Sequence, residues 1–212
     1  MSGLFLVLEG PEGAGKSTLA VRLAERLRER LAGTGTDVIM TREPGGTPVS
    51  DSIRTVLLDP GQHIAPLTEF LLYSASRAQH VEDVIRPALE NGSVVICDRF
   101  TASSVAYQGA GRGLDGEFVK ALNSRVAQGL VPDLTVLLDV EVEVGMERIR
   151  SRGQADRLER ADREFHRRVA ESFRQQAGAA GWLRVNAAQP AEAVEAHVLR
   201  EVDAMLEPWL VR

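Results

Sequence analysis

The sequence predicts an α/β fold with three layers, α/β/α, in which helices cover both faces of a five-stranded parallel sheet. Short apolar runs alternate with longer segments of helical periodicity, an order that is typical of parallel strands joined by crossover helices. The interiors of the apolar runs are nearly continuous rather than alternating, as is expected of strands buried on both faces. No repeat, proline-rich linker or low-complexity tract divides the chain, so we expect residues 1–212 to form a single domain.

The five predicted strands have short interiors made almost entirely of apolar residues. In chain order these interiors read LFLVL, VIM, VVIC, LTVLL and WLRV. Parallel strands between two helical layers need this composition, because neither of their faces meets water. The predicted strands span Leu4–Glu9, Asp37–Thr41, Ser93–Asp98, Leu134–Val140 and Trp182–Asn186.

The predicted helices lie between these strands and after the last one. The first is the clearest, because leucines at 19, 23, 27 and 31 form one apolar stripe and Gly33 and Gly35 then end the helix. A doubly wound sheet of this kind binds its ligands at the carboxyl ends of the strands. The predicted helices span Gly15–Leu31, Thr47–Leu58, Leu67–Asn91, Asp115–Gln128, Val142–Arg152, Arg160–Ala179 and Ala191–Met205.

Composition and charge exclude several classes of protein. With 44% hydrophobic and 26% charged residues, the chain can bury a core and is too apolar to be disordered. Its formal net charge of −5 argues against nucleic acids and membrane surfaces as partners, since both attract positive surfaces. No run approaches the about 20 apolar residues of a membrane helix, and we find no signal peptide. The single cysteine, Cys97, rules out an internal disulfide and fits a reducing cytoplasm, where we expect the protein.

A glycine-rich loop follows the first predicted strand. Its sequence, GPEGAGKST over residues 10–18, matches the phosphate-binding pattern G-x-x-x-x-G-K-S and lies between a strand and a helix, as that loop requires. Amide N–H groups of such a loop face phosphate oxygens, Lys16 is expected at the β- and γ-phosphates, and Ser17 is expected at Mg²⁺. A plain glycine turn is the alternative. The predicted ATP-binding residues of the loop are Gly10, Gly13, Ala14, Gly15, Lys16, Ser17 and Thr18.

A phosphate loop needs a further carboxylate for the metal, usually at the end of a neighbouring apolar strand. Asp98 and Asp139 both end such strands. Asp98 is followed by Arg99, a cation able to bridge the phosphates of two substrates, whereas Asp139 stands just before a predicted helix and resembles a cap. We therefore predict that Ser17 and Asp98 hold Mg²⁺.

The remaining features favour a small kinase. The sequence lacks the N-K-x-D string with which regulatory GTPases read guanine, and it lacks the sensor and signature segments of motor and transporter ATPases. A kinase that moves the γ-phosphoryl group of ATP to an acceptor monophosphate brings many negative charges together. Such an enzyme needs arginines where the two substrates meet.

Residues 147–160 supply a cluster of arginines. This segment is basic, is interrupted by Gly153 and lies between two predicted helices, which suits a mobile lid over phosphates. We predict that Arg148, Arg152 and Arg157 act on the nucleotide. The alternative is a solvated helical surface with i,i+4 ion pairs. That interpretation is preferred for Arg160, Arg163, Arg167 and Arg168.

Several strings occur together along the chain. They are the phosphate loop with Glu12 at its third position, TREPGGT at 41–47, DRF at 98–100, YQG at 107–109 and DRLE at 156–159. In this combination and order, the chain resembles the thymidylate kinase family, whose members phosphorylate dTMP to dTDP with ATP. The resemblance implies a P-loop kinase fold, Mg²⁺ as cofactor, ATP and dTMP as substrates, and a homodimer.

The resemblance also implies where the catalytic cations lie. The family divides by whether its extra catalytic arginine lies in the phosphate loop or in the lid. The variable loop positions 11–14 carry no arginine here, so the chain is similar to the bacterial type with the arginine in its lid. Arg152 is the first choice and Arg157 the fallback. Together with Lys16 and Arg99, Arg152 is expected to spread positive charge over the transferred phosphoryl group.

For the acceptor, the resemblance implies contacts that are carried over position by position. Phe70 would stack on the thymine ring and Arg77 would donate to its O4 edge, with plain core packing as the alternative for Phe70. Glu12 would hold the 3′-hydroxyl group, and Tyr107 would fill the space that a ribose 2′-hydroxyl needs. The other implied contacts are Pro44 and Leu57 beside the methyl group, Arg54 and Arg99 at the acceptor phosphate, and Ser104 and Gln108 near the base.

Two other functions stay open at this point. One is a kinase for a different monophosphate, such as dUMP, dCMP or AMP, which a turnover screen across monophosphates would separate. The other is a P-loop binding protein or switch that hydrolyses ATP without an acceptor. Hydrolysis as fast as transfer would favour it.

Overall fold

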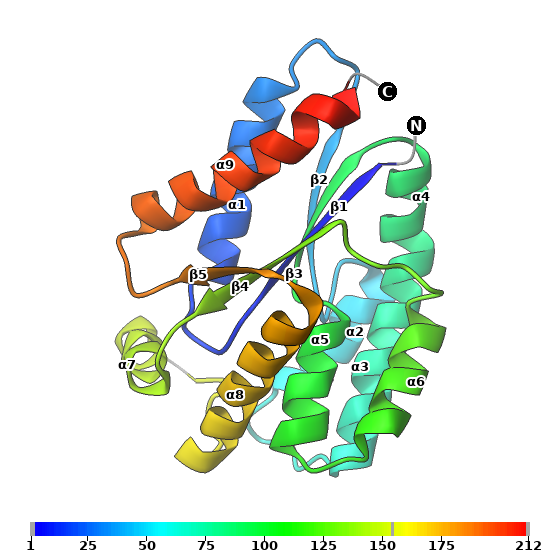
Figure 1. Cartoon of the computed structure of the whole chain (residues 1–212). Coiled ribbons are helices and arrows are strands. Elements are labelled where there is room, and N and C mark those ends of the chain that lie inside the picture. The colour runs from blue at the N-terminus through cyan, green and yellow to red at the C-terminus, as the bar shows by residue number, and fades with distance from the viewer. Residues whose placement is uncertain (1–2, 154, 211–212) are drawn as a thin grey trace.

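The chain forms one parallel sheet of five strands in a computed structural model that describes residues 3–153 and 155–210 (Figure 1). The strand order is β2-β3-β1-β4-β5, and every neighbouring pair is parallel. The predicted fold class is confirmed. The strands are β1 (Leu4–Glu9), β2 (Val38–Arg42), β3 (Val94–Asp98), β4 (Leu134–Asp139) and β5 (Leu183–Asn186).

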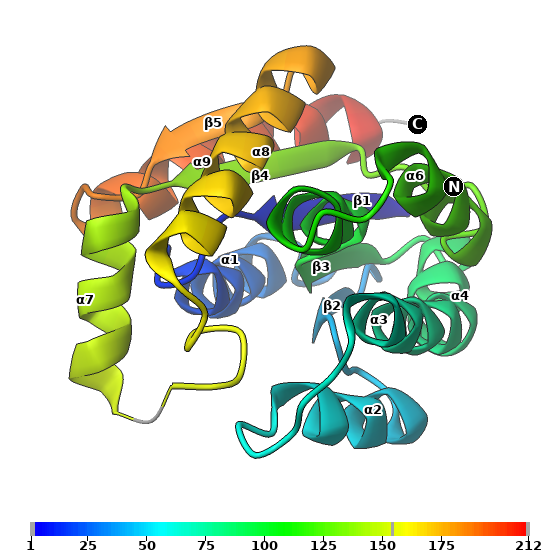
Figure 2. The same ribbon diagram turned by 90° about the horizontal axis from the view of Figure 1, so that it is seen from below.

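Helices cover both faces of the sheet (Figure 2). Helices α1 and α9 form one layer, and most of the remaining helices pack on the opposite face (Figure 1). No helix within the described ranges has both the length and the apolar character needed to cross a membrane. The α-helices are α1 (Lys16–Arg30), α2 (Pro48–Leu58), α3 (Pro66–His80), α4 (Arg86–Glu90), α5 (Thr101–Ser104), α6 (Gly116–Val126), α7 (Val142–Arg152), α8 (Arg163–Ala180) and α9 (Ala191–Leu210), and two π-helical segments are η1 (Val81–Ile85) and η2 (Val105–Gly111).

The central strand β1 explains why the apolar runs are continuous in the sequence. Leu6 and Leu8 face the core that α1 and α9 complete, while Phe5 and Val7 face a second core on the other side of the sheet. All of these side chains are buried. Alternate residues of the strand therefore enter two different cores, and both sets must be apolar.

The helix predicted over Leu67–Asn91 is built from three consecutive segments, α3, η1 and α4. Pro87 has no N–H and cannot donate the usual helical hydrogen bond, which explains a change of helical pairing immediately before it. The helix nevertheless continues to Glu90, close to the predicted end at the Asn91-Gly92 signal.

A helix between the third strand and Asp115 was not predicted. Thr101–Gly111 is nevertheless helical, as α5 followed by η2. Its sequence, TASSVAYQGAG, is rich in small residues and glycine and has no apolar stripe. Its helical form is stabilised by packing, because Ala102, Ala106 and Tyr107 are buried in a cluster with Leu137 of β4 and Phe173 of α8.

Helix α8 begins at Arg163, slightly after the predicted start at Arg160. The Asp162 side chain accepts a hydrogen bond of 2.7 Å from the Phe165 amide and caps the helix. Residues 155–160 of the arginine-rich segment 147–160 therefore precede this helix. Residue 154 of that segment lies outside the described residues.

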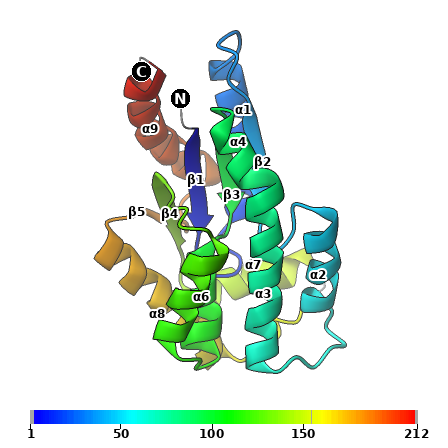
Figure 3. The same ribbon diagram turned by 90° about the vertical axis from the view of Figure 1, so that its right-hand side faces the viewer.

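The carboxyl ends of the strands carry the loops that matter for function. Figure 3 shows β1 pointing toward the end of the sheet where α2 and α7 lie. The phosphate loop after β1, the turn after β2 and the turn after β3 therefore meet at one edge, as the doubly wound topology predicts.

Candidate active site

The phosphate loop packs against α7 through main-chain atoms. Gly13 has a φ of 71°, and a Cβ atom at this position would lie 2.2 Å from the carbonyl oxygen of Gly145. A Cβ atom at Gly145 would lie 2.4 Å from the carbonyl oxygen of Glu12. Both positions therefore require glycine. The phosphate-loop pattern predicts Gly13 but not Gly145, because the second glycine lies inside a helix and belongs to no motif.

Lys16 is buried under the curve of its own loop. Its ammonium group donates to the carbonyl oxygens of Gly10, at 2.9 Å, and Pro11, at 2.8 Å. Burial and the nearby Arg99 guanidinium lower the pKa of Lys16 to about 8, and the surrounding carboxylates limit the shift. The loop thus holds a cation that donates both of these hydrogen bonds to neutral carbonyl groups.

Ser17 and Asp98 are brought together by the pairing of β1 with β3. The Ser17 hydroxyl donates to Oδ2 of Asp98 at 2.5 Å. The other carboxylate oxygen of Asp98, Oδ1, is buried and has no hydrogen-bond partner among the residues that the structure describes. A hydroxyl group beside a carboxylate with a spare oxygen is a donor set that fits Mg²⁺, which uses few protein ligands and takes the rest from phosphates and water.

Asp139, the other strand-end carboxylate, is occupied by arginines. Its oxygens accept hydrogen bonds from Arg174 at 3.0 Å and from Arg184 at 2.8 Å. These contacts join the end of β4 to α8 and to β5. Asp139 therefore has a structural environment quite different from that of Asp98.

Glu12 of the phosphate loop connects the loop to Arg99 and Tyr107. One oxygen of its carboxylate accepts hydrogen bonds from Arg99 and from the Tyr107 hydroxyl, both at 2.9 Å. Burial opposes the ionisation of Glu12, but Arg99, Lys16 and the bond from Tyr107 outweigh it and lower the pKa of Glu12 to about 2. The Arg99 guanidinium also lies 5.0 Å from the centre of the Tyr107 ring.

Arg99 has a left-handed backbone conformation, with a φ of 73°, and its surroundings hold it there. Its amide donates to the carbonyl oxygen of Leu8 at 2.9 Å. The buried Glu9 carboxylate accepts from the amides of Phe100, at 2.9 Å, and Ser103, at 3.2 Å, and so caps α5. Glu9 was missed by the sequence analysis, although an acidic residue at the end of a fully buried strand is itself a signal.

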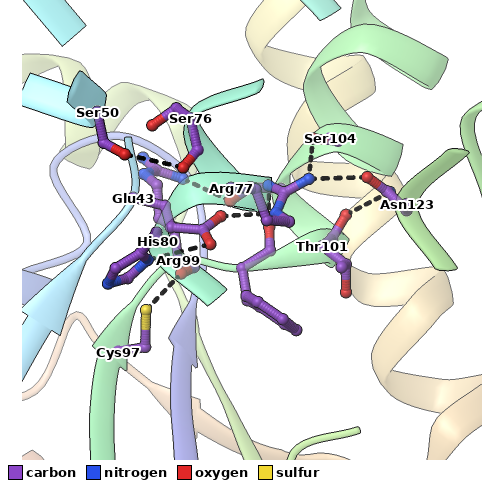
Figure 4. A network of polar contacts seen from close by, with 12 residues as sticks. Glu43, Ser50, Ser76, Arg77, His80, Cys97, Arg99, Thr101, Ser104 and Asn123 are labelled. Atoms are coloured by element: carbon purple, nitrogen blue, oxygen red, sulfur yellow. Dashed lines mark hydrogen bonds and ion pairs between the residues drawn. The ribbon is translucent and has the colours of Figure 1, made fainter. Parts of the chain in front are cut away.

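Arg77 is held at the centre of a buried network (Figure 4). Its Nε donates to Glu43 at 2.7 Å and its Nη1 to Asn123 at 2.7 Å. Nη1 also donates to Ser104, and Nη2 donates to the carbonyl oxygen of Phe100, both at 3.0 Å. These partners come from three separate segments of the chain, the turn after β2, the start and end of α5, and α6, so the guanidinium has a fixed orientation.

A cavity of about 250 Å³ lies where these groups meet. The phosphate loop forms one end, and α3, η2 and the turn after β2 form the other. Most of the predicted site residues line it: Glu12, Gly13, Gly15, Lys16, Ser17, Thr18, Pro44, Arg54, Arg77, Asp98, Arg99, Ser104, Tyr107, Gln108 and Arg152. Eight residues that were given no individual role from the sequence also line it, of which Leu58, Tyr73 and Ser103 lie outside the quoted strings and the others lie in TREPGGT or DRLE: Arg42, Glu43, Leu58, Tyr73, Ser103, Asp156, Leu158 and Glu159.

Six predicted site residues lie outside the lining: Gly10, Ala14, Leu57, Phe70, Arg148 and Arg157. Phe70 is fully buried and packs edge-to-face on Phe118 of α6, with ring centres 5.7 Å apart. Tyr73, one turn later, supplies the aromatic ring of α3 that lines the cavity. Residues three apart on a helix share a face, so the sequence alone does not separate them. Leu57 and Leu58 differ similarly, since Leu57 is buried and Leu58 lines the cavity.

The three arginines of the predicted lid have separate partners. Arg152 is ion-paired with the buried Glu159 and is itself 64% exposed. Arg148 donates to the carbonyl oxygens of Gly13, at 3.3 Å, and Ala187, at 3.0 Å, beside the phosphate loop. Arg157 is ion-paired with Glu69 at 2.6 Å and donates to the carbonyl oxygen of Leu57 at 2.8 Å.

The fold and the cavity define a P-loop kinase: a parallel sheet carries a phosphate loop after its first strand, and an arginine-rich second half of the cavity faces that loop. A family model described as thymidylate kinase matches residues 8–198. The chain belongs to the thymidylate kinase family, and the resemblance seen in its motifs is confirmed.

Individual relatives agree with the family model. A thymidylate kinase of Deinococcus radiodurans is 52% identical over 198 residues, covering 92% of this chain and 94% of the relative. A thymidylate kinase of Pseudomonas entomophila is 50% identical over 215 residues, covering 100% and 99%. A thymidylate kinase of Halothermothrix orenii is 49% identical over 209 residues, covering 97% and 99%.

Proposed function

We propose that this chain transfers the γ-phosphoryl group of ATP to dTMP, giving ADP and dTDP. The observation that carries the proposal is the single cavity that joins the phosphate loop to Arg54, Arg77 and Arg99. A loop for the donor phosphates and cations for an acceptor phosphate lie within reach of one another. Direct transfer between two bound nucleotides needs this arrangement.

The donor half of the cavity belongs to ATP. Amide N–H groups of the phosphate loop face its phosphates, and Lys16 leaves the loop carbonyls to neutralise the β- and γ-phosphates. Ser17 and Asp98 would hold Mg²⁺, which supplies charge neutralisation at the same phosphates when bound. Arg148 is proposed to act beside the loop, since it already contacts Gly13.

The acceptor half fits a deoxynucleoside monophosphate. Arg54 and Arg99 bind its phosphate, and Glu12 accepts a hydrogen bond from the 3′-hydroxyl. Tyr107 fills the position beside Glu12, to which its hydroxyl donates, and excludes a 2′-hydroxyl there. Arg77, with its fixed donors, serves the O4 edge of thymine.

We propose two changes to the residues expected to contact the apolar parts of the base. Because Phe70 is buried between α3 and α6, we assign stacking on the base to Tyr73. Leu58 replaces Leu57 as the residue that, with Pro44, contacts the methyl group. Ser104 and Gln108 remain as polar residues near the base.

The acceptor phosphate is already an anion, so transfer needs positioning and charge neutralisation rather than a strong base. Lys16 and Arg99 supply positive charge from the two sides of the transferred group. Arg152 supplies the third charge after release from Glu159. Each of these cations is worth about 2–4 kcal/mol by comparison with the removal of single stabilising donors elsewhere.

A turnover screen tests the proposal. ADP formation is measured with ATP and Mg²⁺ in the presence of dTMP, dUMP, dCMP or AMP and with no acceptor. We expect turnover to require dTMP and to exceed that with the other acceptors. Equal ADP formation without an acceptor would favour an ATP-hydrolysing binding protein, and a preference for another monophosphate would reassign the substrate.

A homodimer is proposed from the exposed surface of α3 and α6. Leu67 and Leu71 of α3 and Phe118 of α6 are large apolar side chains that remain 43–49% exposed, and the two helices are in contact. A second copy of this chain would cover them. Light scattering of the wild-type protein and of Phe118→Arg measures the mass: we expect a dimer that the variant weakens, and a monomeric wild type would contradict it.

We also propose that the protein acts in the cytoplasm. Cys97 is fully buried, and burial raises the pKa of its thiol well above the usual range. A reduced, unreactive cysteine fits a reducing compartment. Fractionation of cells that express a tagged chain tests the location.

A further inference from the structure

Glu69 of α3 is a fully buried carboxylate outside the cavity lining. It accepts hydrogen bonds from Gln108 at 2.9 Å, from Arg112 at 3.1 and 3.2 Å, and from Arg157 at 2.6 Å. Burial would raise its pKa, but the bonds from Arg112, Gln108 and Arg157 outweigh burial and lower it. A carboxylate so placed stays charged and joins three parts of the chain.

Arg157 is the partner of Glu69 that comes from the arginine-rich segment. Its side chain is only 9% exposed. Its Nε donates to the carbonyl oxygen of Leu57 at 2.8 Å, and its amide donates to that of Leu58 at 3.3 Å. The segment after α7 is therefore fastened to the end of α2 and to α3, two elements far from it in sequence (Figure 2).

The residues around Arg157 form a compact turn that lines the cavity. Oδ1 of Asp156 accepts from the amides of Leu158 and Glu159, both at 2.9 Å. One oxygen of Glu159 accepts from the Asp156 amide at 3.0 Å, and the other is paired with Arg152. Asp156, Leu158, Glu159 and Arg152 all line the cavity, so the position of this turn determines where Arg152 can act.

We infer that Glu69 is a positioning residue for phosphoryl transfer, which acts through Arg157 to hold the turn 155–160, and with it Glu159 and Arg152, at the cavity. The inference rests on the proposed function for its link to catalysis. Glu69 does not itself line the cavity, although Gln108, which donates to it, does. The two arginine partners of Glu69 lie in different parts of the chain, so their removal should have different effects. Arg157 belongs to the turn 155–160. Arg112 follows η2, and its guanidinium stacks on Phe165 of α8, 4.6 Å from the ring centre.

Three single variants and one double variant test the inference. Glu69→Gln keeps the shape of the side chain and removes its charge, and Arg157→Gln breaks the same pair from the turn. Arg112→Gln is the matched control, because it removes the other arginine from the same carboxylate. We expect Glu69→Gln and Arg157→Gln each to lower kcat about tenfold, since a small displacement of a catalytic group has effects of this size. Arg112→Gln should lower the Tm and leave kcat within about twofold of wild type.

The double variant Glu69→Gln/Arg157→Gln should have the kcat of either single variant, because both changes release the same turn. The inference would be overturned if the double variant lost kcat by the product of the two single losses and if, of the single variants, only Arg157→Gln raised the KM for ATP. That result would show that Arg157 contacts the nucleotide directly. A lowered Tm in Glu69→Gln with unchanged kcat, measured well below that Tm, would assign Glu69 a purely structural role.

Hydrogen exchange of the substrate-free protein gives a readout that needs no activity. Amide exchange in the peptide covering residues 155–160 should speed up in Glu69→Gln and Arg157→Gln but not in Arg112→Gln. Unchanged exchange in the first two variants would overturn the inference. If the turnover of the wild type does not depend on dTMP, the proposed function fails. The exchange measurement still shows whether the pair Glu69–Arg157 holds the turn 155–160 in place. Arg157→Gln carries the test alone if Glu69→Gln does not fold.

Discussion

The hydroxyl group of Tyr107 donates a hydrogen bond of 2.9 Å to Glu12, so a residue of η2 is tied directly to the phosphate loop. Arg99 binds the same carboxylate oxygen at 2.9 Å. The two halves of the cavity are therefore linked before any substrate is present.

Lys16→Ala should lower kcat by at least about a hundredfold, because the loop amides alone do not neutralise the γ-phosphate. The Tm should change little by comparison, since within the described residues the Lys16 ammonium group donates to carbonyl oxygens of its own loop. Steady-state kinetics and thermal unfolding measure the two effects. A kcat within about tenfold of wild type, which is 1.4 kcal/mol, would refute the role.

The pH dependence of ATP binding reports the charge on Lys16. Its pKa of about 8 in the folded protein lies below its ordinary value of 10.5. As the pH rises through about 8, the free protein loses this charge, and the Kd for ATP should rise about tenfold per pH unit. Calorimetric titration from about pH 7 to pH 10 measures the rise.

Unfolding does not explain such a loss of binding. The unfolded chain keeps the Lys16 proton up to about 10.5, so this group makes folding more favourable as the pH rises from about 8. The control is Lys16→Arg, in which the side chain stays charged, so the Kd for ATP should not rise in this pH range. A flat wild-type profile would contradict the assignment.

Asp98→Asn should raise the Mg²⁺ concentration needed for half-maximal activity far more than Asp139→Asn does. Asp98 has a buried oxygen beside Ser17 that no described residue bonds, whereas Asp139 accepts hydrogen bonds from Arg174 and Arg184. Asp139→Asn should instead lower the Tm, because two arginines lose their charged partner. Titrations of activity with Mg²⁺ measure this concentration in each variant. An equal increase in the two variants would contradict the assignment of Asp98 to the metal.

Tyr107→Ala should reduce the preference for deoxyribose. An aromatic side chain that excludes a hydroxyl group acts by sterics, so its removal admits the ribonucleotide without new contacts. The ratio of kcat/KM for dTMP to that for its ribose counterpart measures the effect. Tyr107→Phe is the control, since it keeps the ring and loses only the bond to Glu12. A wild type that uses both sugars alike would remove this role.

Arg152→Ala should lower kcat about a hundredfold and leave the KM for dTMP nearly unchanged, because a cation supplied to the transferred group acts on the transition state. Arg160→Ala is the control, as an arginine of the same segment outside the cavity lining. Kinetics at saturating ATP measure both. A raised KM for dTMP at constant kcat would show that Arg152 binds the acceptor instead.

Local patterns predicted the elements that were strongly marked in the sequence. The interior of β1 is apolar on both faces, and its burial on both sides confirms why that pattern indicates a central parallel strand. The helix Thr101–Gly111 escaped prediction because its stability comes from packing of small residues on β4 and α8. Tertiary contacts of this kind leave no periodicity in the chain.

In the site, too, residues in a contiguous motif could be predicted, whereas residues that depend on tertiary contacts could not. The phosphate loop is a contiguous string, so its place at the cavity could be predicted from residues 10–18. Glu9, Glu43 and Glu69 could not be predicted in the same way, because their partners lie 91, 34 and 88 positions away in the chain. Buried carboxylates acquire a role only from such distant partners.

The contact between Gly13 and Gly145 has a consequence for mutational screens. The phosphate loop and α7 touch through main-chain atoms, and any side chain at Gly145 would push them apart. A saturation library selected for growth would thus score Gly145 as intolerant as Lys16, although it carries no group that reacts or binds. At such a position intolerance marks the closeness of two backbones, and a map of essential positions would overstate the number of chemically active ones.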